Sequence, residues 1–312
     1  MVDVFILTLS QLAYLFILIF VGFLIIKIKI LPESSDTILS KLESYVLIPS
    51  LILSTFMNNF KIENISSYGV YFLAGILVSL LMILVAIILT KILYSGDKLY
   101  SYGIAFSNFS FMGNAVVLAL FPSIFTEYLI FVLPFWFFVY LWGVPSLLRI
   151  NSNEKIIFKD RIKVLINPMV ISMFVGIFIG LINLKLPVFL TESVITLGSL
   201  MTPIAMLITG MTIAKIDIGK MIRKFSVYTL SVIRLVVIPL LAIFVLYFVE
   251  FSYSLKLCIV CSLAMPLGLN SIIILNAYGH DTQEASAMAL ISHLLSLITI
   301  PFIFTILNFM LK

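Results

Sequence analysis

Two apolar segments of this sequence contain Asn, Ser, Gly and Pro, residue types that interrupt a helix and bind polar ligands. The first segment reads AFSNFSFMGNAVVLALF, and the second reads CSLAMPLGLNSIIILNAYG. The candidate binding residues in them are Asn108, Gly113, Asn114, Pro266, Gly268, Asn270 and Ser271. Gly weakens a helix and Pro lacks a backbone donor, so both segments are predicted to unwind locally.

An unwound segment inside a membrane helix creates a half-helix with its own N-terminus. Such an end carries a partial positive charge and free N–H groups, so it favours an anion such as a carboxylate. The amides of Asn108, Asn114 and Asn270 would add hydrogen bonds without the cost of a buried charge. The alternative is that these residues only hold neighbouring helices together. We favour the binding site because the features recur at corresponding positions of the two halves of the chain.

Three charged or titratable residues are further candidates, for charge or for coupling to H⁺ or Na⁺. Arg234 lies in the apolar stretch YTLSVIRLVVIPLL, where it either attracts an anionic substrate or is a paired structural cation. His293 is expected to be a neutral, hydrogen-bonded core residue, with proton coupling as the alternative. Glu43 is expected at a solvated helix start, with binding of a coupling ion as the alternative.

The composition requires a membrane to position these residues. Of the 312 residues, 62% are hydrophobic and only 11% are charged, whereas a soluble domain has about 25% charged residues. The net charge of +5 comes from short loops between apolar runs, so a nucleic-acid partner is not expected. Phosphate-binding loops, paired-His motifs and nucleophile elbows are absent from the sequence, so we expect no cofactor, no metal and no enzymatic activity.

Ten apolar runs are long enough to be membrane-spanning helices, which predicts an all-α integral membrane protein. The predicted spans are Val4–Ile26, Thr37–Met57, Ser67–Leu93, Tyr100–Phe121, Thr126–Leu148, Val164–Ile182, Leu190–Ile213, Phe225–Val249, Leu255–Ala277 and Ser286–Leu311. Spans 4 and 9 are the two interrupted segments.

The distribution of Lys and Arg predicts the orientation of these spans. Of the 19 Lys and Arg residues, fourteen lie in the odd-numbered loops, which follow spans 1, 3, 5 and 7. Four lie on the other side, and Arg234 lies inside span 8. Positive residues accumulate in cytoplasmic loops, so the odd-numbered loops are predicted to be cytoplasmic and both termini outside. The expected location is the plasma membrane.

The polar loop around residues 149–163 divides the single domain into two sets of five spans, 1–150 and 163–312. Because five is odd, the second set enters the membrane from the opposite face, which makes an inverted repeat. Pro49 and Pro203 lie at similar positions in the second span of each half, and this agrees with the repeat.

Several motifs resemble the auxin efflux carrier family of membrane transport proteins. The main one is MPLGLNSIIILNAYGHDTQEASAMALISHLLSLITIP, from Met265 to Pro301. The stretches LESYVLIPSLIL, INPMVISMFVGIFIGL and SLMTPIAMLITGMTI resemble the second, sixth and seventh spans of that family. Two positions depart from the pattern: Ala115 stands where the family usually has proline, and Asn276 replaces a small residue. The first departure predicts a milder break in span 4.

The resemblance implies ten spans and a crossing of spans 4 and 9 near the substrate site. It also implies alternating access between a scaffold (spans 1, 2, 6 and 7) and a core (spans 3–5 and 8–10). The implied cargo is an organic anion: auxin in plant members, malate or malonate in bacterial ones, which the short central loop resembles.

Two other functional classes stay open on the sequence. An ion-coupled exchanger or symporter of bile-acid-symporter-like architecture would favour intramembrane Asp or Glu, which this chain almost lacks. A receptor or intramembrane enzyme is disfavoured by short loops and by the lack of a catalytic dyad. The sequence does not decide the substrate, the direction of transport or whether a homodimer forms.

Overall fold

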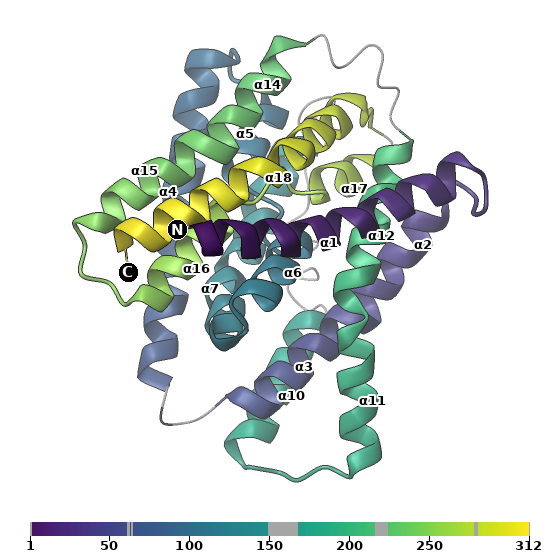
Figure 1. Cartoon of the computed structure of the whole chain (residues 1–312), viewed down its shortest axis with the longest axis vertical. Coiled ribbons are helices and arrows are strands. Elements are labelled where there is room, and N and C mark those ends of the chain that lie inside the picture. The colour runs from purple at the N-terminus through teal and green to yellow at the C-terminus, as the bar shows by residue number, and fades with distance from the viewer. Residues whose placement is uncertain are drawn as a thin grey trace.

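The computed structural model describes residues 2–60, 63, 65–148, 168–215, 224–277 and 280–311, and these form an all-helical structure (Figure 1). This confirms the predicted all-α class. Within the described residues, six helices are long and apolar enough to cross a membrane. They are Ser35–Asn59, Ile65–Leu93, Pro122–Leu148, Val188–Ala214, Phe225–Tyr247 and Gln283–Met310.

Within the described residues, the first half of the chain forms five helical runs, of which the fourth is interrupted. The elements are α1 (Val2–Lys27), α2 (Ser35–Leu42), η1 (Glu43–Leu47), α3 (Ile48–Asn59), α4 (Ile65–Leu93), α5 (Lys98–Ala105), α6 (Phe111–Leu120), η3 (Pro122–Ile124), α7 (Phe125–Phe138), η4 (Val139–Gly143) and α8 (Val144–Leu148). Residues Phe106–Ser110 separate α5 from α6, which is the break predicted in span 4.

The second half contains the corresponding runs, again with an interruption in the fourth. The elements are α10 (Pro168–Leu181), α11 (Val188–Ser199), α12 (Met201–Ala214), α14 (Phe225–Val232), η5 (Ile233–Val237), α15 (Ile238–Tyr247), α16 (Tyr253–Leu263), α17 (Asn270–Ala277) and α18 (Gln283–Leu311). Residues Ala264–Leu269 separate α16 from α17. Part of predicted span 6, residues 164–167, lies outside the described residues.

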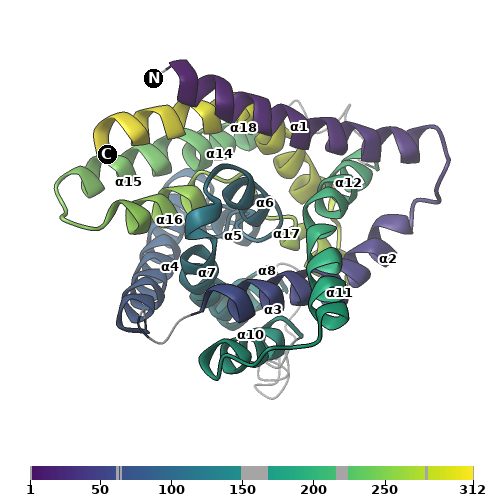
Figure 2. The same cartoon turned by 60° about the horizontal axis from the view of Figure 1, so that its bottom comes forward.

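Helices from the two halves pack against each other in pairs. Helix α1 packs along α12, and α3 packs along α10, which lies beside it in Figure 2. Gly22 and Gly210 make the first contact close, because a Cβ at either position would collide with the facing backbone. In the second contact, a Cβ at Gly176 would lie 2.9 Å from the Cβ of Phe56. Small residues bring membrane helices together in this way.

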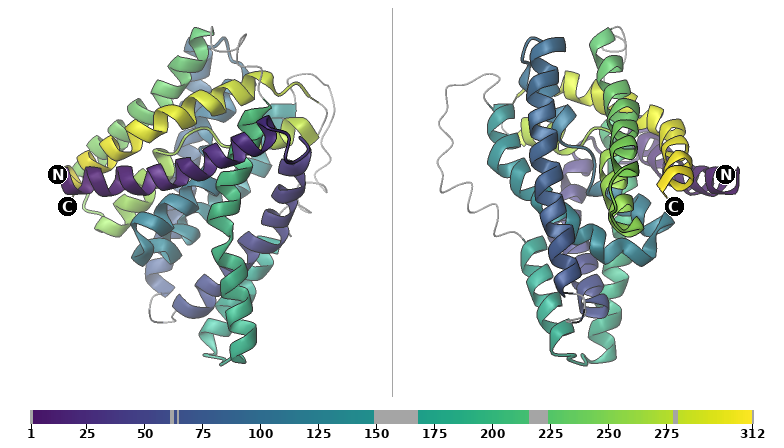
Figure 3. Two further views of the ribbon diagram at one scale, coloured as in Figure 1. Left: turned by 45° about the vertical axis from the view of Figure 1, so that its right-hand side comes forward. Right: turned by 90° about the vertical axis from the view of Figure 1, so that its left-hand side faces the viewer.

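The remaining helices form a second group around the two breaks. Helix α4 packs on α5 and α7, and α18 packs on α14 and α15. Helix α18 also lies along α1 in Figures 1 and 3, which links the two groups. The views in Figure 3 place the first and last helices with their chain ends close together.

The outer surface of the helices is apolar. Along α4, the side chains of Leu73 and Leu77 are 65% and 66% exposed. Apolar side chains at this exposure over a whole helix face are unsuited to water and fit the hydrocarbon of a bilayer. The structure therefore agrees with a multi-pass membrane protein.

Three π-helical turns interrupt the α-helices in the part of the chain that the structure describes, and each ends two residues before a proline. The turns are η1, η4 and η5, and the prolines are Pro49, Pro145 and Pro239. In η1, the N–H of Ile48 bonds the carbonyl of Glu43, five residues earlier. A proline ring clashes with the carbonyl four residues before it, and the wider π turn relieves that clash.

Candidate functional site

The two breaks meet and are joined by backbone pairing. The N–H of Asn108 donates to the carbonyl of Pro266 at 2.8 Å, and Ser107 and Leu267 form an isolated antiparallel bridge. Gly268 permits this approach, because a Cβ there would lie 2.9 Å from the carbonyl oxygen of Ser107. The predicted pair of interrupted helices therefore forms one crossing. Within it, each break supplies partners to backbone groups of the other.

Arg234 lies next to this crossing and donates hydrogen bonds to both broken helices. Its Nη1 donates to the carbonyl of Ile104 at 2.9 Å, in the last turn of α5. Its Nη2 donates to the carbonyl of Ser262, in the last turn of α16, and its Nε donates to the carbonyl of Met265, just after α16. The side chain is 1% exposed, and among the described residues no carboxylate pairs with it. A cation is favourable at a helix C-terminus, and here a single cation serves two such ends.

The sequence left two interpretations of Arg234, a cation that attracts an anionic substrate and a structural cation with partners in the protein. These bonds favour the second. Because three carbonyls occupy its guanidinium, its role in the crossing requires no substrate. In addition, the hydroxyl of Ser107 donates to the carbonyl of Ser262 at 2.6 Å. The C-terminal ends of α5 and α16 are thus tied to each other as well as to the arginine.

His293 of α18 holds the other side of the break in span 4. Its Nδ1 lies 2.7 Å from the carbonyl of Ala289, which only accepts, so Nδ1 carries the proton. Its Nε2 lies 3.1 Å from Nδ2 of Asn108 and accepts from it. The network thus describes a neutral, hydrogen-bonded histidine, with the tautomer and amide orientation assigned from these partners.

Two more side chains fix the breaks. The Oδ1 of Asn108 accepts from the N–H of Met112 at 3.4 Å, so this residue caps the start of α6 as it binds His293. The hydroxyl of Ser292, beside His293 on α18, accepts from the N–H of Leu267 at 3.1 Å. Helix α18 therefore holds both interrupted segments through adjacent residues.

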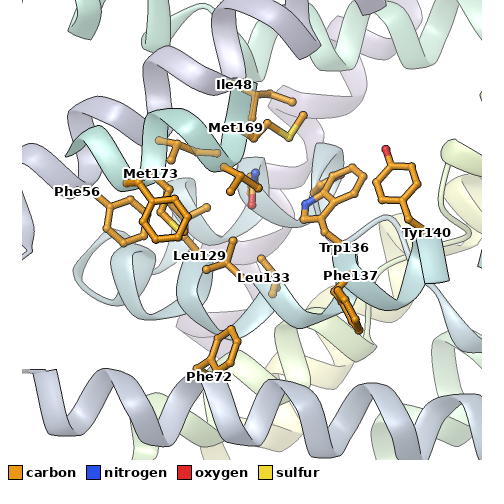
Figure 4. A pocket seen from close by; sticks show the side chains of 16 residues that line it. Ile48, Phe56, Phe72, Leu129, Leu133, Trp136, Phe137, Tyr140, Met169 and Met173 are labelled. Atoms are coloured by element: carbon orange, nitrogen blue, oxygen red, sulfur yellow. The ribbon is translucent and has the colours of Figure 1, made fainter. Parts of the chain in front are cut away.

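A cavity of about 190 Å³ lies beside the crossing, between α3 and α10 on one side and α6 and α7 on the other (Figure 4). Most of its lining is apolar or aromatic. Residues labelled in the figure include Ile48, Phe56, Phe72, Leu129, Leu133, Trp136, Tyr140, Met169 and Met173. The rings of Trp136 and Tyr140 stack with a centroid distance of 6.0 Å.

The start of α6 supplies polar groups to this cavity, together with the Tyr140 hydroxyl and the Trp136 N–H. Ser110, the N-cap residue of α6, and Asn114, one turn further, both line it. Asn114 is 3% exposed, and its Oδ1 has no hydrogen-bond partner among the described residues. A buried amide oxygen without a partner is costly, so a ligand that donates to it would satisfy this atom.

Gly113 allows the start of α6 to lie close to Tyr128. A Cβ at Gly113 would collide with the hydroxyl of Tyr128, which donates to the carbonyl of Phe109 at 2.8 Å. That bond satisfies a carbonyl within the break. Tyr128 was not singled out in the sequence, because nothing distinguishes it from the other aromatic residues of the chain.

The structure separates the remaining predicted residues from the cavity. Asn270 begins α17 and is partly exposed, and Ser271 bonds the carbonyl of Gly268 at 2.8 Å. Neither lines the cavity that contains Asn114. The predicted convergence of Asn108, Asn114 and Asn270 on one ligand is therefore not seen: Asn108 faces His293 instead.

Glu43 requires a correction. The sequence favoured a solvated helix start for this residue, but its side chain is 0% exposed. Helix α2 begins earlier, at Ser35, so Glu43 lies more than two turns inside the helical run.

The helices, their apolar exterior and the supported crossing define a multi-pass α-helical membrane protein. A family model described as "Membrane transport protein" matches residues 7–304, so the chain belongs to this family, the auxin efflux carrier family. The resemblance stated from the motifs is thus confirmed, and the protein is a membrane transporter rather than a member of an enzyme family. A search of curated proteins finds no match to this chain.

Proposed function

We propose that this protein is a secondary transporter that moves a small organic anion, a carboxylate, by alternating access. The observation that carries the proposal is the buried start of α6, which borders a partly open cavity beside the helix crossing. A helix N-terminus offers positive potential and N–H donors to a carboxylate, and low-dielectric walls strengthen that attraction. The amide N–H groups of Asn114 can donate to the carboxylate, and its unpaired Oδ1 can accept from a donor on the body of the ligand.

Ten spans in two inverted repeats are the architecture we propose for this transport. Four shorter apolar helices within the described residues accompany the six long ones. The pairing of α1 with α12 and of α3 with α10 supports the repeat, since exchanging the halves converts one contact into the other. We propose residues 1–150 and 163–312 as the repeats of a single transporter domain.

The proposed orientation places both termini outside the plasma membrane and the odd-numbered loops in the cytoplasm. The charge distribution supports it, with fourteen basic residues in those loops against four on the other side. The closeness of the two chain ends in Figure 3 agrees with an even number of spans.

The cavity lies between the two groups that alternating access would move against each other. The proposed scaffold, spans 1, 2, 6 and 7, supplies α3 and α10, whereas the proposed core supplies α6 and α7. Movement of one group relative to the other would open this space to either side in turn. Arg234, His293 and Ser292 would keep the crossing intact during the movement, since they and their partners all belong to the core.

The apolar lining narrows the class of anion. Malate and malonate carry two carboxylates, whereas the lining is mostly apolar and has few polar groups, which are the side chains of Ser110 and Asn114, the Tyr140 hydroxyl and the Trp136 N–H. The apolar walls, including Phe56 and Trp136, suit an apolar or aromatic body. A monocarboxylate with such a body, an auxin-like molecule, therefore fits better than a small dicarboxylate.

The alternative is an ion-coupled exchanger or symporter of bile-acid-symporter-like architecture that carries another solute. A cation site in the cavity would require carboxylates there, and the cavity lining contains none. The cavity therefore favours the anion.

Ligand binding to purified protein tests the proposal directly. We expect indole-3-acetate to raise the melting temperature more than malate does, and the neutral indole-3-acetamide to have little effect, because ligands stabilise the state that they bind. Asn114→Asp should abolish the shift at nearly constant volume, since it removes the amide N–H donors and any ionised fraction repels the carboxylate. Asn59→Asp, the same change at an exposed position of α3, is the matched control.

Transport completes the test. Proteoliposomes containing wild-type protein should take up labelled indole-3-acetate, and those containing the Asn114→Asp variant should not. A larger thermal shift with the neutral amide than with the acid would contradict the anion assignment. Equal uptake by wild type and Asn114→Asp would remove Asn114 from the site.

A further inference from the structure

Glu43 is a buried carboxyl group that the proposed substrate site does not use. Its side chain is 0% exposed, and neither carboxyl oxygen has a hydrogen-bond partner among the described residues. An ionised carboxylate in apolar surroundings without a partner is very unfavourable, and such a group takes up a proton or a cation instead.

The elements around Glu43 offer no counter-charge within the described residues. Its turn, η1, packs against α2, α3, α10, α11 and α12. Helices α3, α10 and α12 contain no Asp, Glu, Lys, Arg or His. On α11, Glu192 is exposed, and on α2, Lys41 is exposed while Asp36 is paired with Lys215 at 2.5 Å.

A direct hydrogen bond connects Glu43 with the wall of the cavity. The backbone carbonyl of Glu43 accepts from the N–H of Ile48 across the π turn, and Ile48 lines the cavity. Ile52 and Phe56 continue the same wall along α3. π turns are places where a helix changes its hydrogen-bond register at low cost, and they are frequent at functional sites. A change of charge at Glu43 thus acts on the helix that forms one side of the cavity.

We propose that Glu43 is the residue that binds and releases a proton during the transport cycle, which makes H⁺ the coupling ion. This inference rests on the proposed function, because it assigns the coupling to the same cavity. The protonated carboxyl is neutral and suits the buried position described here. Release of the proton requires a state in which water reaches η1.

A proton fits this position better than Na⁺. A hard cation is held by several oxygen ligands at once, and no group of three or more His, Cys, Asp or Glu side chains occurs within the described residues. A proton, by contrast, neutralises a single carboxyl group without further ligands.

Infrared spectroscopy tests the protonation without any substrate. We expect wild-type protein at neutral pH to show the carbonyl band of a protonated carboxylic acid. The band should be absent from Glu43→Gln, whose amide mimics the neutral carboxyl in size. Glu192→Gln, which removes an exposed carboxyl on the neighbouring helix α11, should retain it. Identical spectra of wild type and Glu43→Gln would overturn the proposal.

Transport assays then test the coupling, with labelled indole-3-acetate as the probe. In proteoliposomes, Glu43→Gln should lose net uptake driven by a pH gradient down to the level of protein-free liposomes. It should retain exchange of labelled for unlabelled anion, which needs no release of the proton. Glu192→Gln should match wild type in both modes. Net uptake by Glu43→Gln that follows the pH gradient as in wild type, or wild-type uptake that follows a Na⁺ gradient instead, would overturn the proposal.

The two proposals fail in different ways. If wild-type protein carries no indole-3-acetate in either mode but the infrared band depends on Glu43, the substrate assignment is wrong and proton binding at Glu43 stands. If transport occurs and the band does not depend on Glu43, the substrate assignment stands and the coupling site is wrong.

Discussion

The two interrupted helices reach similar shapes by different means. The break after α16 contains its own helix-breaking residues, Pro266 and Gly268. The break after α5 contains neither proline nor glycine, since Phe106–Ser110 reads FSNFS and Ala115 takes the place of the family's proline. The expected milder break is nevertheless not observed: the chain is non-helical throughout Phe106–Ser110.

The difference is that the first break is maintained by its neighbours. Asn108 bonds Pro266, His293 and Met112, and Tyr128 bonds Phe109. In a membrane, backbone groups released from a helix must find partners within the protein. A break can therefore be imposed by partners on other helices, whereas a proline imposes it locally. We expect the stability of the first break to depend on those partners.

The largest effect should come from the cation shared by both breaks. Arg234→Met keeps the length of the side chain but removes its donors from the carbonyls of Ile104, Ser262 and Met265. We expect the free energy of unfolding to fall by about 3 kcal/mol, at about 1 kcal/mol for each carbonyl. Chemical denaturation in detergent measures this. Arg234→Lys keeps the charge but not the planar guanidinium, so its free energy of unfolding should fall by less than that of Arg234→Met. Equal losses in the two variants would contradict shared capping of the two helix ends.

The next largest effect should come from the contact point between the breaks. In Gly268→Ala, the added Cβ would lie 2.9 Å from the carbonyl oxygen of Ser107, which forces the two segments apart. Overpacking of this kind costs about 1–3 kcal/mol. Gly69→Ala on α4 is the control, because a Cβ there meets nothing within 4 Å. A melting temperature unchanged by Gly268→Ala would show that the crossing is looser than described.

A comparison of two asparagines sharpens the distinction between the breaks. Asn108→Ala removes the bonds to His293 and Met112 from a break without proline, so we expect a loss of about 1–2 kcal/mol. Asn270→Ala, directly after a break with its own proline and at a partly exposed position, should change stability by less than about 0.5 kcal/mol. Thermal melting of both variants measures the difference. Equal losses would mean that the two breaks are held alike.

The smallest effect should come from the serines of α18. Ser292→Ala removes the acceptor for the N–H of Leu267, for which we expect a loss of about 1 kcal/mol. Ser296→Ala removes only a bond to its own helix, from its hydroxyl to the carbonyl of His293 at 2.6 Å. The second variant should melt close to wild type. The reverse order would remove Ser292 from the support of the crossing.

The helices, the positions of the breaks and the family could be predicted from the sequence, because they depend on composition and on local residue types. Long apolar runs identified the helices. Pro266 and Gly268 located the second break, because these residue types destabilise a helix by themselves. Asn108 and Ser110 indicated the first break only as polar residues in an apolar run. The motifs also identified the family, which the family model confirms.

The cavity and the partners of Arg234 were not predictable in this way. The cavity is lined mainly by apolar residues such as Phe56 and Trp136, and in a membrane protein these types occur equally on the lipid-facing surface. Arg234 binds backbone carbonyls, which every residue possesses, so no residue type marks its partners. The burial of Glu43 was missed because it depends on packing of η1 against α10, α11 and α12 of the second half, which the local sequence does not indicate.

The close contact between α1 and α12 has a consequence for biosynthesis. Helix α1 leaves the ribosome before α12, yet the partner that faces its Gly22 belongs to the second half of the chain. Until α12 is inserted, the glycine surface of α1 must face lipid tails, which cannot fill its groove as closely as a helix does. The first helix is thus expected to reach its final position only late in synthesis, when the seventh predicted span enters the bilayer beside it.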